Sequence, residues 1–204
     1  MKLVLASASP RRKELLKQIG IAFEAVSADI DENSRGFSDA SEYVMEMARQ
    51  KALLVAERLA DQGEAQGLVL GADTTVVIDG EILGKPTDYD DAFAMIRRIQ
   101  GKWHEVITGI ALVDIKTLTP LVDKECTRVK IRAMTDEMIE AYLATGESFD
   151  KAGSYGIQGY GSLMVEKLDG CYFNVMGLPI YRLSTLLEKE GFTMLSWMRC
   201  KDKK

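Results

Sequence analysis

Two short basic segments that could each bind phosphate lie on either side of one aspartate in this chain of 204 residues. The first segment reads Ser-Ala-Ser-Pro-Arg-Arg and covers residues 7–12, and the second is Gly84-Lys85-Pro86. Asp73 lies between them in an apolar stretch. Arginine and lysine bind phosphate through charge-assisted hydrogen bonds, and a carboxylate can take a proton from an attacking water. The combination predicts an enzyme that cuts a polyphosphate.

The first basic segment fits the loop between a strand and a helix. A short apolar strand, Leu3–Leu5, precedes it, Ser9 suits the N-cap, and Pro10 suits the first helical position. A helix N-terminus presents unpaired backbone N–H groups and a positive dipole end, which favour an anion. The alternative is an ordinary helix start with two surface arginines, and the segment taken alone does not decide between them.

Asp73 interrupts an apolar run, Leu68–Ile78, that is typical of a buried strand. Burying an unpaired carboxylate is costly, so a lysine or a metal ion is expected beside it. Lys51 falls on the apolar face of a predicted helix over residues 41–60 and is one candidate, Lys85 is another, and Glu32 could share a divalent ion with Asp73. The alternative is a structural carboxylate, with Lys51 reaching the surface.

The remaining pattern alternates strands and helices and predicts an α/β fold. Further strands are expected at 23–27, 82–83, 106–115, 121–133 and 162–168, and further helices at 88–100, 135–146 and 178–190. The glycine-rich stretch 152–159 predicts a loop whose backbone can approach a ligand closely. His104 is the one histidine, and we interpret it as a structural hydrogen-bonding group rather than a general base.

Composition limits the partners. A formal net charge of −5 argues against general affinity for nucleic acid or membrane surfaces. Cys126, Cys171 and Cys200 lack metal-site spacing and are interpreted as reduced thiols. The start of the sequence lacks an apolar signal segment, and no apolar run approaches transmembrane length. The expectation is a cytoplasmic protein with a small phosphorylated substrate.

Five motifs, in this order, resemble the Maf family of nucleoside triphosphate pyrophosphatases, first known as septum formation inhibitors. They are LASASPRRKELL at residues 5–16, GADT at 71–74, ILGKP at 82–86, TG at 108–109 and DKAGSYGIQG at 150–159. The resemblance extends from Met1 to about Phe192. It implies a single domain over residues 1–192 with a polar C-terminal tail at 193–204, and the last motif resembles the branch that prefers dTTP and UTP.

The resemblance also implies a fold and a reaction. The fold would be an elongated mixed sheet with flanking helices and a cleft between two lobes, related to inosine triphosphate pyrophosphatases. The reaction would convert a nucleoside triphosphate into the monophosphate and pyrophosphate with a divalent metal ion, Mg²⁺ or Mn²⁺, in a protein that is often a homodimer. A nucleotide-pool house-cleaning role follows from that activity.

Each candidate residue has an expected role. Asp73 would orient or deprotonate the attacking water, Lys51 and Lys85 would offset charge at the α-phosphorus, and Glu32 and Asp73 would hold the metal. Substrate binding is assigned to Ser7, Arg11, Arg12, Thr74 and Gln158. The Gln158 amide offers a donor and an acceptor, which matches the edge of uracil or thymine.

Two other classes of protein remain open. A binding module could use the same anion site without chemistry, and it would not need Asp73. A nucleic-acid-binding protein could use Arg11, Arg12 and Lys13, although the acidic net charge disfavours it.

Overall fold

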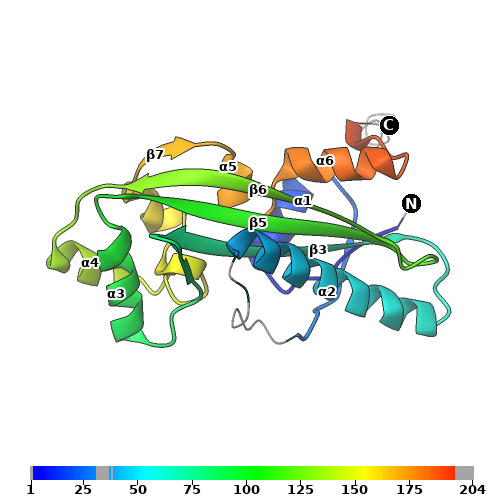
Figure 1. Ribbon diagram of the computed structural model, residues 1–204, viewed down its shortest axis with the longest axis horizontal. Helices are drawn as coiled ribbons and strands as arrows, with labels where there is room; N and C mark the ends of the chain where they lie inside the picture. The colour runs from blue at the N-terminus through cyan, green and yellow to red at the C-terminus, as the bar shows by residue number, and fades with distance from the viewer. Residues whose placement is uncertain (1, 31–36, 38, 196–204) are drawn as a thin grey trace, which may run out of the picture. The chain divides into compact units, whose positions relative to one another are not determined.

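Three of the strands contain runs of consecutive buried residues and are therefore covered on both faces there: Leu3–Leu5, Leu68–Ile78 and Trp103–Asp114. The computed structural model describes residues 2–30, 37 and 39–195 (Figure 1). The strands within this part of the chain are β1 (Leu3–Leu5), β2 (Glu24–Ala25), β3 (Leu68–Ile78), β4 (Glu81–Leu83), β5 (Trp103–Asp114), β6 (Pro120–Ile131) and β7 (Val165–Asp169). They form one sheet in the order β2-β1-β3-β5-β6-β7, with β4 paired to β3.

Parallel and antiparallel pairs both occur in this sheet. β1 runs parallel to β2 and to β3, whereas β4 is antiparallel to β3 and β7 is antiparallel to β6. The Asp79-Gly80 pair makes the tight β3–β4 connection, with both residues at positive φ, as such hairpin turns require. The sheet is therefore mixed.

Helices connect most of the strands. They are α1 (Pro10–Gln18), α2 (Ala40–Asp61), α3 (Tyr89–Ile99), α4 (Asp136–Leu143), α5 (Tyr172–Val175) and α6 (Ile180–Lys189), with short 3₁₀ turns η1 (Ala152–Ser154) and η2 (Gly159–Leu163). Asp88 and Thr135 cap α3 and α4 by accepting hydrogen bonds from the Asp91 and Met138 amides. A mixed sheet with flanking helices confirms the predicted α/β class.

Three segments differ from the sequence prediction. β2 is shorter than the strand predicted over 23–27. The strand predicted over 162–168 begins only at Val165, because Gly159 adopts a positive φ and starts η2 instead. α5 was not predicted, since a helix of four residues is too short to show a period of 3.6.

The described chain forms two compact units. The first contains residues 1–73, 108–125 and 177–204, and the second contains residues 74–107 and 126–176. β3, β5 and β6 each contribute residues to both units. A single domain over 1–192 stays a prediction, as does the tail at 193–204, most of which lies outside the described residues.

The core of the first unit lies between α2 and one face of the sheet. Figure 1 shows α2 along one side of these strands and α6 along the other. Small side chains of α2 meet alternate residues of the strands, in a cluster formed by Val4, Ala6, Ala48, Ala52, Val55, Ala56, Val69, Ala111, Val113 and Ile115. The many alanines bring the helix backbone close to the sheet.

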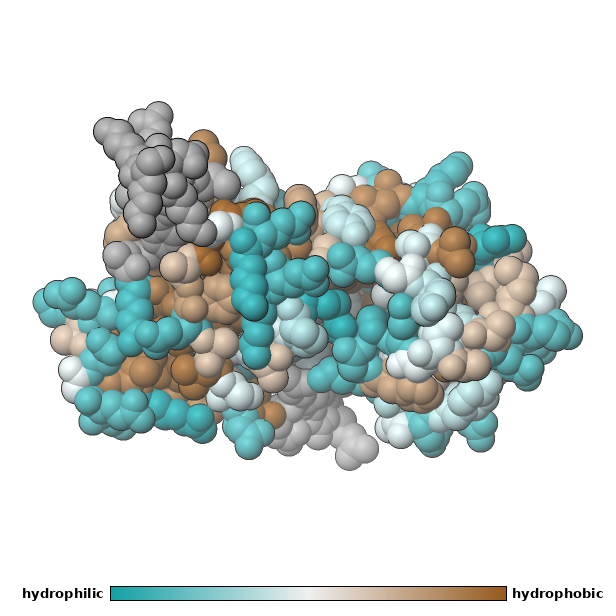
Figure 2. All heavy atoms as spheres, turned by 180° about the vertical axis from the view of Figure 1, so that it is seen from behind, coloured by the Kyte–Doolittle hydropathy of each residue, from teal (hydrophilic) through white to brown (hydrophobic). Residues whose placement is uncertain are grey.

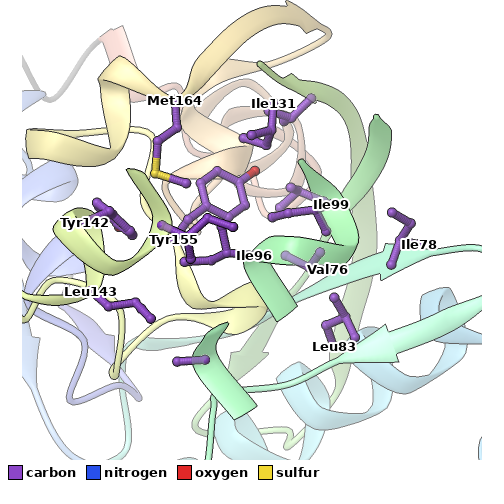
Figure 3. Packing of buried hydrophobic residues seen from close by; sticks show 14 residues of the cluster. Val76, Ile78, Leu83, Ile96, Ile99, Ile131, Tyr142, Leu143, Tyr155 and Met164 are labelled. Carbon is purple, nitrogen blue, oxygen red and sulfur yellow. The ribbon is translucent and has the colours of Figure 1, made fainter. Parts of the chain in front are cut away.

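The second unit has a separate core with larger side chains. Figure 3 shows Tyr155 among Ile96, Ile99 and Met164. Val76 and Leu83 of the β3–β4 hairpin belong to the same cluster. The glycine-rich motif thus supplies a core residue, Tyr155, beside its exposed positions.

Hydrophilic side chains cover much of the face shown in Figure 2, with smaller hydrophobic areas between them. Among the described residues, no helix has both the length and the apolar character needed to cross a bilayer.

Candidate active site

Two motif glycines let α2 approach the sheet closely. A Cβ at Gly71 of β3 would collide with the carbonyl oxygen of Ala48 and lie 2.9 Å from the Ala52 nitrogen. A Cβ at Gly109 of β5 would collide with the Val44 carbonyl group. Only glycine permits such an approach between a helix and two strands. The glycines of two motifs are therefore explained by packing. The same packing brings Lys51 of α2 next to Asp73 of β3.

Lys51 and Asp73 form a buried ion pair. Residues 71 and 73 share one face of β3 because strand side chains alternate, and Lys51 lies between the two α2 alanines that contact Gly71. The Lys51 Nζ atom is 2.7 Å from Asp73 Oδ1, and the two side chains are only 6% and 10% exposed. This confirms the prediction of a cation beside Asp73, a position that Lys51 occupies.

A buried pair of this kind is costly to desolvate and is weak evidence for a purely stabilising role. Replacing one partner alone would leave an uncompensated buried charge. A carboxylate held in one orientation by an ammonium group is, however, a suitable arrangement for directing a water molecule.

Ser7 organises the loop between β1 and α1. Its hydroxyl is buried and accepts hydrogen bonds from the Ser9 amide at 3.2 Å and from Arg12 Nη1 at 3.3 Å. Ser9 occupies the N-cap position, as predicted, yet its side chain makes no capping bond. The side-chain oxygen that satisfies an N–H group of this loop is thus that of Ser7.

The two arginines of the loop are both half-buried. Arg12 Nε donates to the Gly177 carbonyl oxygen at 2.8 Å, in addition to the bond to Ser7. These two contacts fix the Arg12 guanidinium beside the loop that precedes α1. Ser7 and Arg12 are therefore brought together as the sequence predicted.

Lys85 and Thr74 belong to the second unit, where Lys85 is exposed and Thr74 is half-buried. The residue before Lys85 is tied to the glycine-rich motif, because the Gly153 amide donates to the Gly84 carbonyl oxygen at 3.0 Å. Gly153 has a φ of +67°, and a Cβ there would lie 2.9 Å from Val76. Two motifs that are distant in sequence therefore meet through their backbones.

Gln158 precedes η2 and is exposed. Among the described residues, no hydrogen bond joins its side-chain amide to neighbouring backbone. Sequence reasoning missed what holds this loop, which is Glu147: its carboxylate accepts hydrogen bonds from the Tyr160 and Gly161 amides at 3.1 and 3.2 Å.

His104 is a structural residue, as predicted. Its Nε2 atom shares a hydrogen bond of 2.7 Å with the Tyr155 hydroxyl, and the rings meet edge to face. Burial lowers the pKa of His104 to about 4 and raises the pKa of Tyr155. The imidazole is therefore neutral at physiological pH, and it anchors Tyr155 in the core of the second unit.

Of the two carboxylates predicted to hold the metal, the structure describes Asp73. Glu32 lies outside the described residues, and no group of three or more His, Cys, Asp or Glu side chains that could hold a metal occurs among those described. Magnesium commonly uses one or two carboxylates and completes its octahedron with waters and substrate phosphates. Asp73 with one further carboxylate would fit that mode of binding.

Comparison with known proteins identifies the class. The family model described as "Maf-like protein" matches residues 2–190. The chain belongs to the Maf family.

Individual relatives match over nearly the whole chain. A protein of Acetivibrio thermocellus named dTTP/UTP pyrophosphatase is 51% identical over 197 residues, which cover 96% of this chain and 98% of the relative. A protein of the same name from Caldicellulosiruptor bescii is 48% identical and covers 95% of this chain and 97% of its own. The solved structure of the Staphylococcus aureus Ham1 protein is 14% identical, with a TM-score of 0.49 over 93% of this chain and 100% of that one.

Proposed function

We propose that this protein is a nucleoside triphosphate pyrophosphatase that hydrolyses dTTP and UTP to the nucleoside monophosphate and pyrophosphate. The observation that carries the proposal is the near full-length similarity, at 51% and 48% identity, to two relatives named dTTP/UTP pyrophosphatase. The buried Lys51–Asp73 pair and the Ser7–Arg12 loop supply groups suited to this chemistry.

The phosphates would bind at the loop before α1. The Arg12 guanidinium is fixed there by Ser7 and Gly177, and Arg11 adds a second positive charge. Lys51 and Lys85 would offset the negative charge that develops around the α-phosphorus. Thr74, which follows Asp73 in β3, would add a hydroxyl contact to the substrate.

Asp73 would act on water. Its carboxylate orients the water and accepts its proton while the water oxygen bonds to the α-phosphorus. The bond from that phosphorus to the bridging oxygen breaks, and pyrophosphate leaves with the electron pair. Lys51, at 2.7 Å from Oδ1, would keep the carboxylate in a fixed orientation.

Metal dependence is part of the proposal. Asp73 and Glu32 would hold Mg²⁺ or Mn²⁺ through carboxylate oxygens, which these ions prefer. The bound ion would supply neutralising charge to the phosphate oxygens.

Base selection is assigned to Gln158. Its amide is exposed and makes no hydrogen bond within the described residues, so the donor and the acceptor can both face a pyrimidine edge. Such a contact discriminates because a base with the wrong pattern leaves the amide unpaired.

Two further proposals concern context. We infer a homodimer from the family resemblance, and light scattering coupled to gel filtration tests it.

A cytoplasmic location fits the interpretation of the cysteines as reduced thiols, and Cys171 carries a free thiol. Fractionation of the source cells tests the location.

The decisive experiment is an assay of pyrophosphate release from dTTP, UTP, CTP and GTP with Mg²⁺, with Mn²⁺ and with a chelator. We expect release from dTTP and UTP in excess over CTP and GTP, and loss of activity in the chelator. Nucleotide binding without pyrophosphate release would favour the binding-module alternative. Activity that persists in the chelator would remove the metal from the proposal.

A further inference from the structure

The loop that carries Gln158 is held at both ends by groups from one region of the second unit. At its start, the Gly156 amide donates to the Tyr142 hydroxyl at 3.2 Å. At its end, the Tyr160 and Gly161 amides donate to the Glu147 carboxylate at 3.1 and 3.2 Å. Tyr142 lies in α4, and Glu147 follows the turn that ends this helix. Gln158 lies between the two attachment points.

Glycines make the loop compact around these contacts. Gly159 has a φ of +60°, and a Cβ there would collide with the Glu147 carboxylate. A Cβ at Gly161 would collide with the Gly156 carbonyl oxygen, so the two ends of the loop touch. The backbone of residues 156–161 is thus closed on itself, and the Glu147 side chain occupies the space that a larger residue at 159 would need.

Glu147 is itself fixed. Its backbone amide donates to Thr145 Oγ1 at 3.3 Å, and Thr145 Oγ1 in turn donates to the Tyr142 carbonyl oxygen at 2.7 Å. The Lys151 ammonium donates to the Glu147 carbonyl oxygen and to Asp150. These contacts hold the Glu147 backbone, so the carboxylate that it carries can determine where the loop backbone lies.

We propose that Glu147 is a positioning residue for base selection, which holds the backbone after Gln158 so that the Gln158 amide meets the pyrimidine in one orientation. The proposal rests on the proposed function and on the role given there to Gln158. Glu147 does not touch the substrate. Its effect on selectivity arises because a preorganised amide loses less conformational freedom on binding.

A carboxylate suits this task better than an amide. Each Glu147 oxygen accepts one N–H group, Oε1 from Tyr160 and Oε2 from Gly161. Glutamine would retain one acceptor and place an NH₂ group against the other amide, whereas alanine would leave both amides without this partner. We therefore expect a smaller loss of loop positioning in Glu147→Gln than in Glu147→Ala.

The test uses Glu147→Ala and Glu147→Gln, with Glu140→Ala on the exposed surface of α4 as the matched control. The measured quantity is the ratio of kcat/KM for dTTP to that for CTP, together with thermal unfolding of each variant. We expect the ratio to fall about tenfold in Glu147→Ala and about threefold in Glu147→Gln, on the scale of one or two lost hydrogen bonds. The control should retain the wild-type ratio.

A double-mutant cycle separates positioning from general damage. In a Gln158→Ala background, Glu147→Ala should leave the ratio unchanged within about twofold, because the amide that it positions is absent. A merely structural role predicts an equal loss for all nucleotides in both backgrounds. If Glu147→Ala does not fold, the same comparison is made with Glu147→Gln.

Three outcomes overturn the inference: an unchanged ratio in both Glu147 variants, a uniform loss over all nucleotides, or an undiminished effect in the Gln158→Ala background. A wild-type protein that releases no pyrophosphate from dTTP or UTP is a separate result, obtained before any variant is made. That result would reject the proposed function and this inference with it.

Discussion

The Lys51–Asp73 pair and the Gln158 loop are held in place in opposite ways. Lys51 and Asp73 are buried, and a direct side-chain contact of 2.7 Å fixes them. The Gln158 side chain is exposed and makes no hydrogen bond within the described residues, while the backbone around it is fixed by Tyr142 and Glu147.

This difference indicates which positions tolerate change. A buried charge pair is sensitive to the loss of either member, because the remaining charge has no compensation. An exposed side chain on a firmly held backbone can be replaced without disturbing its neighbours. We therefore expect substitutions at the pair to abolish turnover, and substitutions at the loop to alter the choice of nucleotide.

The largest effect is expected from Asp73→Asn. The variant keeps the shape of the side chain but cannot accept a proton from water, so kcat should fall at least about a hundredfold, the usual scale for a general base. Pyrophosphate release measures the effect, circular dichroism checks the fold, and Asp90→Asn on the exposed surface of α3 is the control. Near-normal turnover would remove Asp73 from the catalytic role.

Arg12→Ala tests whether the guanidinium group beside the loop before α1 also acts in catalysis. We expect kcat/KM to fall about a hundredfold, because phosphate charge loses a hydrogen-bonded cation in a partly desolvated site. Arg12→Lys keeps the charge and loses the planar fork that contacts Ser7 and Gly177, so it should recover only part of the activity. Wild-type kinetics in the alanine variant would make Arg12 a surface charge.

The pH dependence of stability tests the core of the second unit. The pKa of His104 is lowered from 6.5 to about 4 by burial, so the unfolded chain binds more protons between these values. This contribution to stability is complete above pH 6.5, and it decreases by about 3 kcal/mol as the pH falls to 4. Denaturant unfolding of wild type and His104→Gln should show this extra loss only in the wild type; parallel curves would exclude it.

Gln158→Ala gives the smallest expected effect and the sharpest contrast with the ion pair. Activity on dTTP and UTP should fall about tenfold, since a hydrogen bond lost in a shielded site costs about 1–3 kcal/mol. Activity on CTP and GTP should change less, which lowers the preference ratio. Gln66→Ala, at an exposed position outside the proposed site, is the control. An equal fall for every nucleotide would leave the pyrimidine preference without a structural basis in this residue.

Local patterns of residue types predicted the class of fold and most of the elements. The apolar run 68–78 is one strand with the predicted bounds, and α2 extends the helix predicted over 41–60 by one residue at each end. Local patterns suffice here because burial periodicity and caps are written in neighbouring residues. The cost of a buried carboxylate likewise predicted a cation beside Asp73 before any contact was known.

The contact between Lys51 and Asp73 emerged only from the tertiary structure, because it depends on Gly71 admitting α2 to the face of β3. Only the structure showed that Glu147 holds the Gln158 loop and that His104 holds Tyr155. These contacts join residues that are far apart in the chain or separated by a turn. Their partners are set by packing geometry, which no local pattern of residue types records.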